Sequence, residues 1–437
     1  MYVTWFWVLL ALFLIYAVIP RMLTLFFQFH VFKKAHTRKE IALTFDDGPD
    51  PRFTPRLLDL LKKYNVKATF FIVGEKVEKH PDLIRQMHQE GHLIGIHHYV
   101  HQSNWFMSPK RSLQYLRRTA DIVENIIGIR PIYYRPPWGL NTLFDFTQKE
   151  FKMVLWSLMV GDWWSFIGKK GIEWQIRKRI KGGSVIILHD SGDTVGANAT
   201  APHQMLEALE RLLPELSAKY QFVKIDQLIH LEQRIYKHLS WGQRIVSRLW
   251  LKWERIFRKL DQLETIDEEN QFLYFKQRKY LGKTIQLNKD EQLQHGDQII
   301  EIHLNNELLF EMTSQSKSEV QLAIQLIRSM NQLLPKLAQK IVPQLKEVKA
   351  LYGVTMIYRG TKQFGFTVIE LPKGIFSWLT RFYLRLLLLV LHPDGSNRLK
   401  TKNERLQPKI IAMSSHDLIK KYGKESVKLG KIEENHA

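Results

Sequence analysis

The sequence predicts an α/β fold in which parallel strands close into an irregular barrel, followed by a C-terminal α+β domain. Short β-rich runs alternate with helical patterns from residue 41 to residue 225, which is typical of βα units. Polar residues follow five of these runs, and parallel barrels build active sites at such C-terminal strand ends. Past Ile229 the pattern changes, and 437 residues exceed what one hydrophobic core usually organises.

The predicted strands of the first domain share β-branched and aromatic residues. They are IALTF at 41–45, ATFFIV at 68–73, LIGIH at 93–97, IYYR at 132–135, MVLWS at 153–157, VIILH at 185–189 and QFVKI at 221–225. The segments between them have helical spacing. In PDLIRQMHQEG at 81–91, Leu83, Ile84 and Met87 share one face and a glycine ends the helix.

The N-terminus predicts a transmembrane helix. From Tyr2 to Pro20 no residue is charged, and this length crosses a hydrocarbon core of about 30 Å. A cleaved signal peptide is the alternative, but no Lys or Arg precedes the apolar run and no A-x-A cleavage site follows it. The sequence therefore predicts a single-pass anchor in the cell membrane. Basic residues after the helix favour a cytoplasmic enzyme by the positive-inside rule; they are Arg21, Lys33, Lys34, Arg38 and Lys39.

The composition limits the classes of partner that the chain can bind and the residues that can hold a metal. Sixty-four Lys and Arg against 43 Asp and Glu give a formal charge of +21, which favours phospholipid headgroups, cell-wall polymers or nucleic acid. The basic residues are spread along the chain without a recognisable reader motif, so no nucleic-acid partner is expected. Because the chain has no cysteine, disulfides and Cys-ligated zinc are excluded, and any metal must be held by His, Asp or Glu.

Behind the first domain, residues 241–263 predict a basic amphipathic helix that either lies on an anionic membrane or packs as a linker. Strands near 299–304, 352–359 and 364–371 and a helix around 320–334 predict an α+β unit, in which His303 is a strand-face residue. The apolar stretch 374–395 predicts a buried or interfacial helix, because Arg381 and Arg385 lie mid-segment. The expected divisions are 1–35 (anchor and juxtamembrane segment), 36–232 (catalytic domain), 233–268 (linker helix) and 269–437 (α+β domain).

Two groups of residues in the first domain suggest metal chemistry. Asp46 and Asp47 are adjacent carboxylates at a strand end, although paired Asp before Gly-Pro is also ordinary turn chemistry. His97 and His101 have H-x-x-x-H spacing, and with one carboxylate they make a three-ligand site that leaves a coordination position open for water. A solvated histidine-rich loop is the alternative reading of this second group.

Five ordered motifs make residues 41–230 resemble the NodB-type polysaccharide deacetylases of carbohydrate esterase family 4. They are TFDDGP at 44–49, HHYVH at 97–101, RPPWG at 135–139, WSLMVGDW at 156–163 and ILHD at 187–190. The resemblance implies the irregular (β/α) barrel of that family. The C-terminal unit resembles an uncharacterised domain that accompanies such deacetylases in bacteria.

The resemblance also implies a role for each matching residue. Asp47, His97 and His101 bind one divalent ion, for which zinc is expected and cobalt or nickel can substitute. The other implied residues are the general base Asp46, the residue Arg135 that holds it, the general acid His189 with Asp162 beside it, and the substrate or oxyanion residues Trp138, Trp163 and Ile187.

Two positions depart from the family pattern. Met159 stands where the fourth motif usually has its first carboxylate, which puts the groove wall and substrate choice in doubt. His98 stands where the family usually has Ser or Thr, and it is a bystander, an alternative ligand or a groove residue.

The leading hypothesis is metal-dependent hydrolysis of N-acetyl groups from an acetylated amino sugar, in a cell-envelope glycan or a lipid-linked saccharide. The alternative is a catalytically silent, membrane-tethered glycan-binding or scaffold protein, suggested by Met159 and by the large C-terminal unit. Family members that modify peptidoglycan typically work outside the membrane, which opposes the charge bias, so both orientations stay open.

Overall fold

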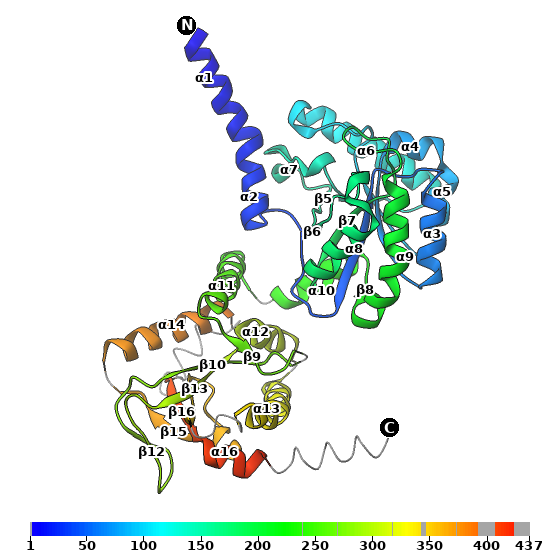
Figure 1. Ribbon diagram of the computed structural model, residues 1–437. Coiled ribbons are helices and arrows are strands. Elements are labelled where there is room, and N and C mark those ends of the chain that lie inside the picture. Colours follow the sequence, from blue (N-terminus) through cyan, green and yellow to red (C-terminus); the bar gives the residue numbers. More distant parts are fainter. Residues whose placement is uncertain are drawn as a thin grey trace. The chain divides into compact units, whose positions relative to one another are not determined.

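The computed structural model describes residues 2–237, 239–268, 270–316, 318–341, 347–372, 374–391 and 407–423. Contacts divide the chain into two compact units, Met1–Arg234 and Ile235–Ala437 (Figure 1). Each unit has its own hydrophobic core. The described part of residues 374–395 ends at residue 391, so the last four residues of that predicted helical stretch lie outside the described residues.

A parallel sheet organises the first unit, as predicted. Its strands follow the order β5-β4-β3-β2-β1-β7-β6, and β8 pairs with β1. The bounds are β1 Glu40–Asp46, β2 Thr69–Ile72, β3 Leu93–Ile96, β4 Tyr133–Tyr134, β5 Lys152–Met153, β6 Leu158–Met159, β7 Val185–His189 and β8 Gln221–Phe222. The run predicted at 153–157 is divided between the short strands β5 and β6 on either side. β5 and β6 are the two ends of the strand order, although they are close together in the sequence. The sheet must therefore curl to bring its two ends near each other, and it forms a half-barrel.

The segment before β1 packs against the sheet. Phe32 bridges Val154 in parallel orientation, and Lys34 bridges Ser184 in antiparallel orientation. The backbone N–H of Ala35 donates to the carbonyl of Gly183 over 3.0 Å. The boundary expected between residues 35 and 36 therefore falls within a segment that is bonded to the sheet.

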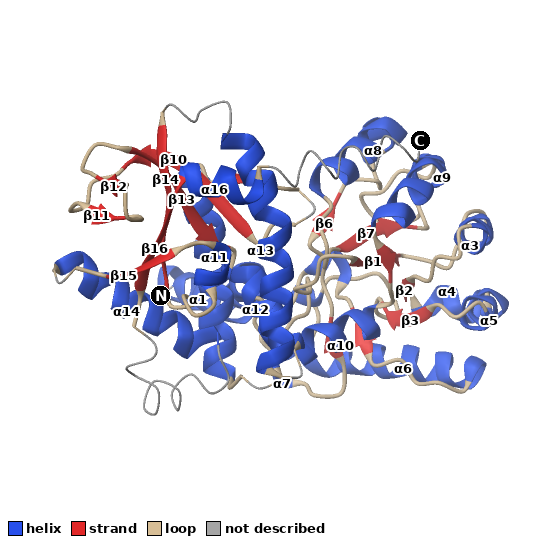
Figure 2. Cartoon of the chain, turned by 90° about the horizontal axis from the view of Figure 1, so that it is seen from below, coloured by secondary structure: helices blue, strands red, loops and turns tan. Residues whose placement is uncertain are grey.

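Helices cover the sheet of the first unit (Figure 2). They are α3 Thr54–Lys63, α4 Gly74–Lys79, α5 Pro81–Gln89, α6 Pro109–Ile127, α7 Phe144–Thr147, α8 Gly168–Arg179, α9 Ala201–Lys219 and α10 Ile225–Tyr236. Sequence signals explain their ends: Ser108 caps α6 by accepting from the Arg111 N–H, Pro109 opens it, and Gly128 ends it at φ 73°. In α5 the predicted face is confirmed at Ile84 and Met87, which are fully buried.

The N-terminal helix has three parts, α1 Tyr2–Phe13, the π-helical turn η1 Leu14–Val18 and α2 Ile19–Phe27. Its residues Tyr2–Phe26 are long and apolar enough to span a membrane, which a signal sequence near an N-terminus also satisfies. The predicted helix is therefore present, and its role as an anchor stays a prediction.

The second unit contains a mixed sheet in the order β15-β16-β14-β13-β10-β9, and β11 pairs with β12. Its elements are α11 Trp241–Leu260, β9 Glu264–Thr265, β10 Leu273–Lys279, β11 Ile285–Gln286, β12 Gln292–Leu293, β13 Gln298–Leu304, α12 Asn306–Gln315, α13 Glu319–Ile341, β14 Val348–Thr355, β15 Thr367–Glu370, α14 Ile375–Leu391, β16 Lys409–Ser414 and α16 Ser415–Tyr422. The predicted α+β character is confirmed, and His303 lies on β13 as expected.

The two amphipathic segments of this unit form helices that contact each other, α11 and α14. The Trp250 ring of α11 lies 4.7 Å from the Tyr383 ring of α14, and Leu251 is fully buried. One face of α11 therefore packs against the second unit, as the linker-helix alternative predicted. Trp253 and Phe257 stay about half exposed, so contact of this face with a membrane is untested.

Candidate metal and catalytic site

The sheet brings the predicted site residues to one edge. Asp46 ends β1 and Asp47 follows it, His97 follows β3, Arg135 follows β4, and His189 ends β7. Since β7, β1, β2, β3 and β4 are consecutive parallel neighbours, their carboxyl ends meet at the same edge. Register places Asp46 directly beside His189. Residues separated by more than 140 positions in the sequence are thereby neighbours.

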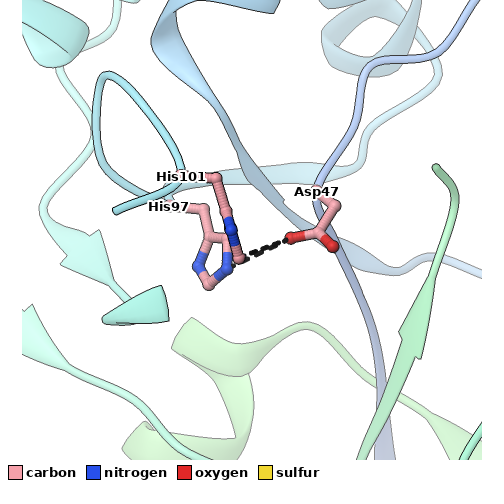
Figure 3. A group of neighbouring side chains, drawn as sticks. All are labelled: Asp47, His97 and His101. Atoms are coloured by element: carbon pink, nitrogen blue, oxygen red, sulfur yellow. Dashed lines mark ion pairs between the residues drawn. The ribbon is translucent and has the colours of Figure 1, made fainter. Parts of the chain in front are cut away.

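Asp47, His97 and His101 form a compact group in which one ligand atom of each lies within 4.8 Å of the others (Figure 3). The Nε2 atoms of both histidines lie 3.3 Å from Asp47 Oδ1. Asp47 and His97 are buried and His101 is partly buried. Two imidazoles and a carboxylate are the donor set that catalytic zinc sites use when they keep a position open.

The hydrogen bonds around Asp47, His97 and His101 indicate whether these residues can bind a cation. His97 Nδ1 donates to the backbone carbonyl of Arg135 over 2.7 Å, which in the neutral ring leaves the Nε2 lone pair facing Asp47. Asp47 Oδ1 is buried and has no ordinary hydrogen-bond donor among the described residues. Lone pairs that converge on a carboxylate repel one another unless a positive ion lies between them, so the residues present fit a divalent metal.

The protonation states support the same conclusion. Burial acts to raise the pKa of Asp47, but the contact with His97 and the positive charge of His189 hold it well below its ordinary value. Burial lowers the pKa of His101 to about 4, against the opposing effect of Asp47. The carboxylate is therefore ionised and the His101 imidazole neutral at pH 7, which are the forms that bind metals.

Asp46 lies beside a buried arginine. Arg135 is fully buried, and its Nη1 donates to Asp46 Oδ1 over 2.5 Å and contacts Thr44 Oγ1 at 2.9 Å. A second anchor comes from the backbone carbonyl of Val154, which accepts from Arg135 Nε over 3.1 Å. The guanidinium is thus held on two sides, and it fixes the direction of the Asp46 carboxylate.

His189 is paired with Asp162. Its Nδ1 lies 3.2 Å from Asp162 Oδ1, and its backbone N–H donates to Asp162 Oδ2 over 2.7 Å. Burial acts to lower the pKa of His189, but the charge and hydrogen bond of Asp162 overcome this and raise the pKa to about 9. The Trp163 ring contacts the imidazole edge at 5.4 Å between centroids. The imidazole is therefore protonated near neutral pH and can donate a proton.

The remaining predicted residues lie around these groups. Trp138 is 43% exposed, and its ring lies 4.3 Å from that of His101. Ile187 is buried in β7, two positions before His189 and hence on the same face of the strand. Trp138 and Asp47 have positive φ values of 54° and 75° without being glycine, and such backbone strain tends to gather at functional sites.

The two departures from the family pattern have different surroundings. His98 is fully buried, and its Nε2 lies 3.3 Å from Ser112 Oγ on α6, so it is absent from the group that gathers Asp47, His97 and His101. Burial lowers the pKa of His98 to about 3. Met159 ends β6, where it pairs with Ile187 of β7; the residue is 39% exposed, and its backbone carbonyl accepts from Arg179.

Sequence reasoning missed two residues that hold Asp47 in place. Thr194 Oγ1 donates to Asp47 Oδ2 over 2.6 Å, and Lys76 Nζ donates to the Asp47 carbonyl over 2.8 Å. Lys76 also contacts Ser191 Oγ at 2.7 Å. Thr194 lies in an ordinary polar loop and Lys76 in a charged helix, so neither had a local pattern to reveal it.

Two family models match parts of the chain. Residues 33–146 match the family model described as polysaccharide deacetylase, and residues 243–422 match the one described as YkoP domain. Two peptidoglycan-N-acetylglucosamine deacetylases of Bacillus cereus are 36% and 35% identical to the chain. Their alignments cover 44% and 46% of this chain and 68% and 92% of the relatives.

A third relative is the peptidoglycan-N-acetylmuramic acid deacetylase PdaC of Bacillus subtilis. It is 34% identical over 45% of this chain and 40% of its own length. The matches to these relatives are confined to less than half of the chain. Because the first two relatives are more than 30% identical and are covered over more than two thirds of their length, the chain belongs to the polysaccharide deacetylase family and is a hydrolase that acts on carbon–nitrogen bonds.

Proposed function

We propose that this protein removes N-acetyl groups from amino sugars of a cell-envelope glycan, in a reaction that depends on one divalent metal ion. The observation that carries the proposal is the convergence of three groups at one sheet edge. These are the ligand group Asp47, His97 and His101, the pair of Asp46 with Arg135, and the pair of His189 with Asp162. The peptidoglycan deacetylases among the relatives support the envelope substrate.

The residues divide the chemistry among them. Asp47, His97 and His101 hold the ion, which when bound polarises the amide carbonyl and makes water more acidic. Asp46 accepts the proton of the attacking water, and Arg135 fixes the direction of this carboxylate. His189, protonated because of Asp162, gives its proton to the departing amine.

The test is release of acetate by the purified full-length chain. Peptidoglycan fragments and chitooligosaccharides serve as substrates, before and after removal of metal by a chelator and with zinc, cobalt or nickel returned. We expect activity to vanish on chelation and to return with metal, zinc included. Glycan binding with no acetate release under any metal would contradict the proposal and favour the silent glycan-binding alternative.

The pH dependence should report on His189. Because the protonated imidazole is the active form and its pKa is raised to about 9, the rate should fall as the pH rises through that value. In Asp162→Asn the largest raising contribution is lost while burial still lowers the pKa of His189, so the alkaline limb should move to lower pH. The measurement is kcat/KM against pH, which reports the pKa of the free enzyme. Asp121→Asn, an exposed carboxylate on α6, is the control that should keep the original limb.

A further inference from the structure

The N-terminal helix is bonded to the loop that follows Trp138. The backbone N–H of Leu143 donates to the Tyr16 carbonyl over 2.8 Å, a carbonyl in the π-helical turn η1. Thr24 Oγ1 donates to Asn141 Oδ1 over 3.0 Å, and the Arg21 guanidinium donates to the Gly139 carbonyl. Figure 1 shows the α2 end of this helix near α7. The helix therefore contacts residues 138–146, which border the catalytic site at Trp138. Together with residues 105–111, this segment is called the rim of the site below.

Burial along the helix marks which face contacts the domain. Ala17, Pro20 and Thr24 are buried, and their spacing puts them on one side of a helix. Met22 and Phe26 on other sides are 46% and 55% exposed. Both Thr24 and Asn141 are completely buried, so cleavage after this helix would break their hydrogen bond and uncover the surface that the helix buries. The docked face thus favours retention of the helix.

Length then decides how far the catalytic domain lies from the bilayer. Docking begins near Phe13, whose ring lies 5.5 Å from that of Trp105, and continues at Tyr16. The part of the helix before this contact, from residue 2 to residue 12, is only about 16 Å long at 1.5 Å per residue. A hydrocarbon core is about 30 Å thick. A helix that spans it must place its docked part, and the rim it touches, at the membrane surface.

The rim has the composition of a membrane interface. Phe106, beside Trp105, is 79% exposed, and Leu143 is 43% exposed. Lys110 and Arg111 at the start of α6 are exposed as well. Aromatic side chains at the headgroup level together with basic residues beside anionic lipid are typical of protein surfaces that lie on a bilayer.

We propose that the rim formed by residues 105–111 and 138–146 lies against the lipid bilayer, so that the site acts on an N-acetylated glycan carried at the membrane surface. This substrate class rests on the proposed deacetylase function, whereas the contact with lipid does not. Either orientation of the chain across the membrane is compatible with it, because the rim follows the helix to whichever face carries the domain.

Because the chain has no cysteine, single labels can test the contact with lipid. Phe106→Cys places a fluorophore on the rim, and Ser217→Cys places one on the exposed end of α9, at the opposite end of the sheet. The full-length protein is reconstituted in nanodiscs whose lipids carry a headgroup quencher. We expect severalfold stronger quenching at residue 106 than at residue 217. Equal quenching, or a membrane-extracted chain that begins after residue 28, would overturn the proposal.

The contact between the N-terminal helix and the rim can be tested separately, by measuring kcat with a soluble substrate. Arg21→Ala frees the Gly139 carbonyl beside Trp138, and we expect kcat to fall on the order of tenfold with the metal content unchanged. Arg21→Lys should restore part of the rate, and Met22→Ala on the exposed side of the helix should have no effect. An unchanged kcat in Arg21→Ala would show that the helix does not position the rim.

The substrate class is tested by comparing a lipid-linked N-acetylglucosaminyl substrate in the same nanodiscs with soluble chitotetraose. Confinement to the same bilayer should raise kcat/KM for the lipid-linked substrate by about tenfold or more. Deacetylation of chitotetraose with no preference for the lipid-linked substrate would overturn the substrate class and leave the proposed function standing. No acetate from either substrate would contradict the proposed function, while the quenching still reports the contact with lipid.

Discussion

Replacing Asp46 with asparagine is expected to leave the metal bound and to lower kcat by about 10³-fold or more, because the amide cannot accept the proton of the attacking water. The substitution preserves the size of the side chain next to Arg135, so the positions of the surrounding groups should change little. Metal content and acetate release are measured on the same sample.

This prediction needs a control variant and a check that the Asp46→Asn protein is folded. Glu173→Gln removes another buried carboxylate, paired with Arg177 on α8, and should keep normal turnover. Asp46→Asn also leaves the buried Arg135 without its partner charge, so a thermal melt must confirm that the variant is folded. Loss of the metal from the folded variant would mean that the roles of Asp46 and Asp47 are reversed.

Replacing His97 and His101 together with alanine is expected to abolish both metal binding and acetate release. The double variant leaves Asp47 as the single remaining member of the ligand group, and one carboxylate does not retain a divalent ion at a catalytic site. Metal analysis of the purified protein after dialysis is the measurement, and one metal per chain in this variant would rule out the assignment.

The matched control uses the neighbouring histidine. His98→Ser introduces a residue that the family commonly has at this position, and the buried His98 side chain contacts Ser112 and not the ligand group. We expect full metal content and activity near that of the unaltered protein. Metal loss in His98→Ser would instead identify His98 as a ligand and revise the site.

The local sequence was sufficient to predict the strands that have a clear apolar pattern. β1 and β7 end at a motif residue and β3 ends one residue before a motif, and a buried parallel strand is readable as a continuous apolar run. Their shared direction already implied that the polar residues after them meet at one edge. The short strands β5 and β6 were not separated correctly, because two-residue strands exist through their neighbours' hydrogen bonds and have no periodicity of their own.

By itself, the sequence determined the family, the parallel α/β architecture, the apolar N-terminal helix and the residues proposed for the chemistry, because each has a local pattern or an ordered motif. Only the tertiary structure decided that Thr194 and Lys76 hold Asp47, that His98 turns toward α6, and that Arg21 reaches Gly139. These are single contacts between segments distant in sequence, whose partners become neighbours only when the sheet curls and the helix docks. A lone side chain has no spacing from which such a contact can be predicted, so packing alone determines it.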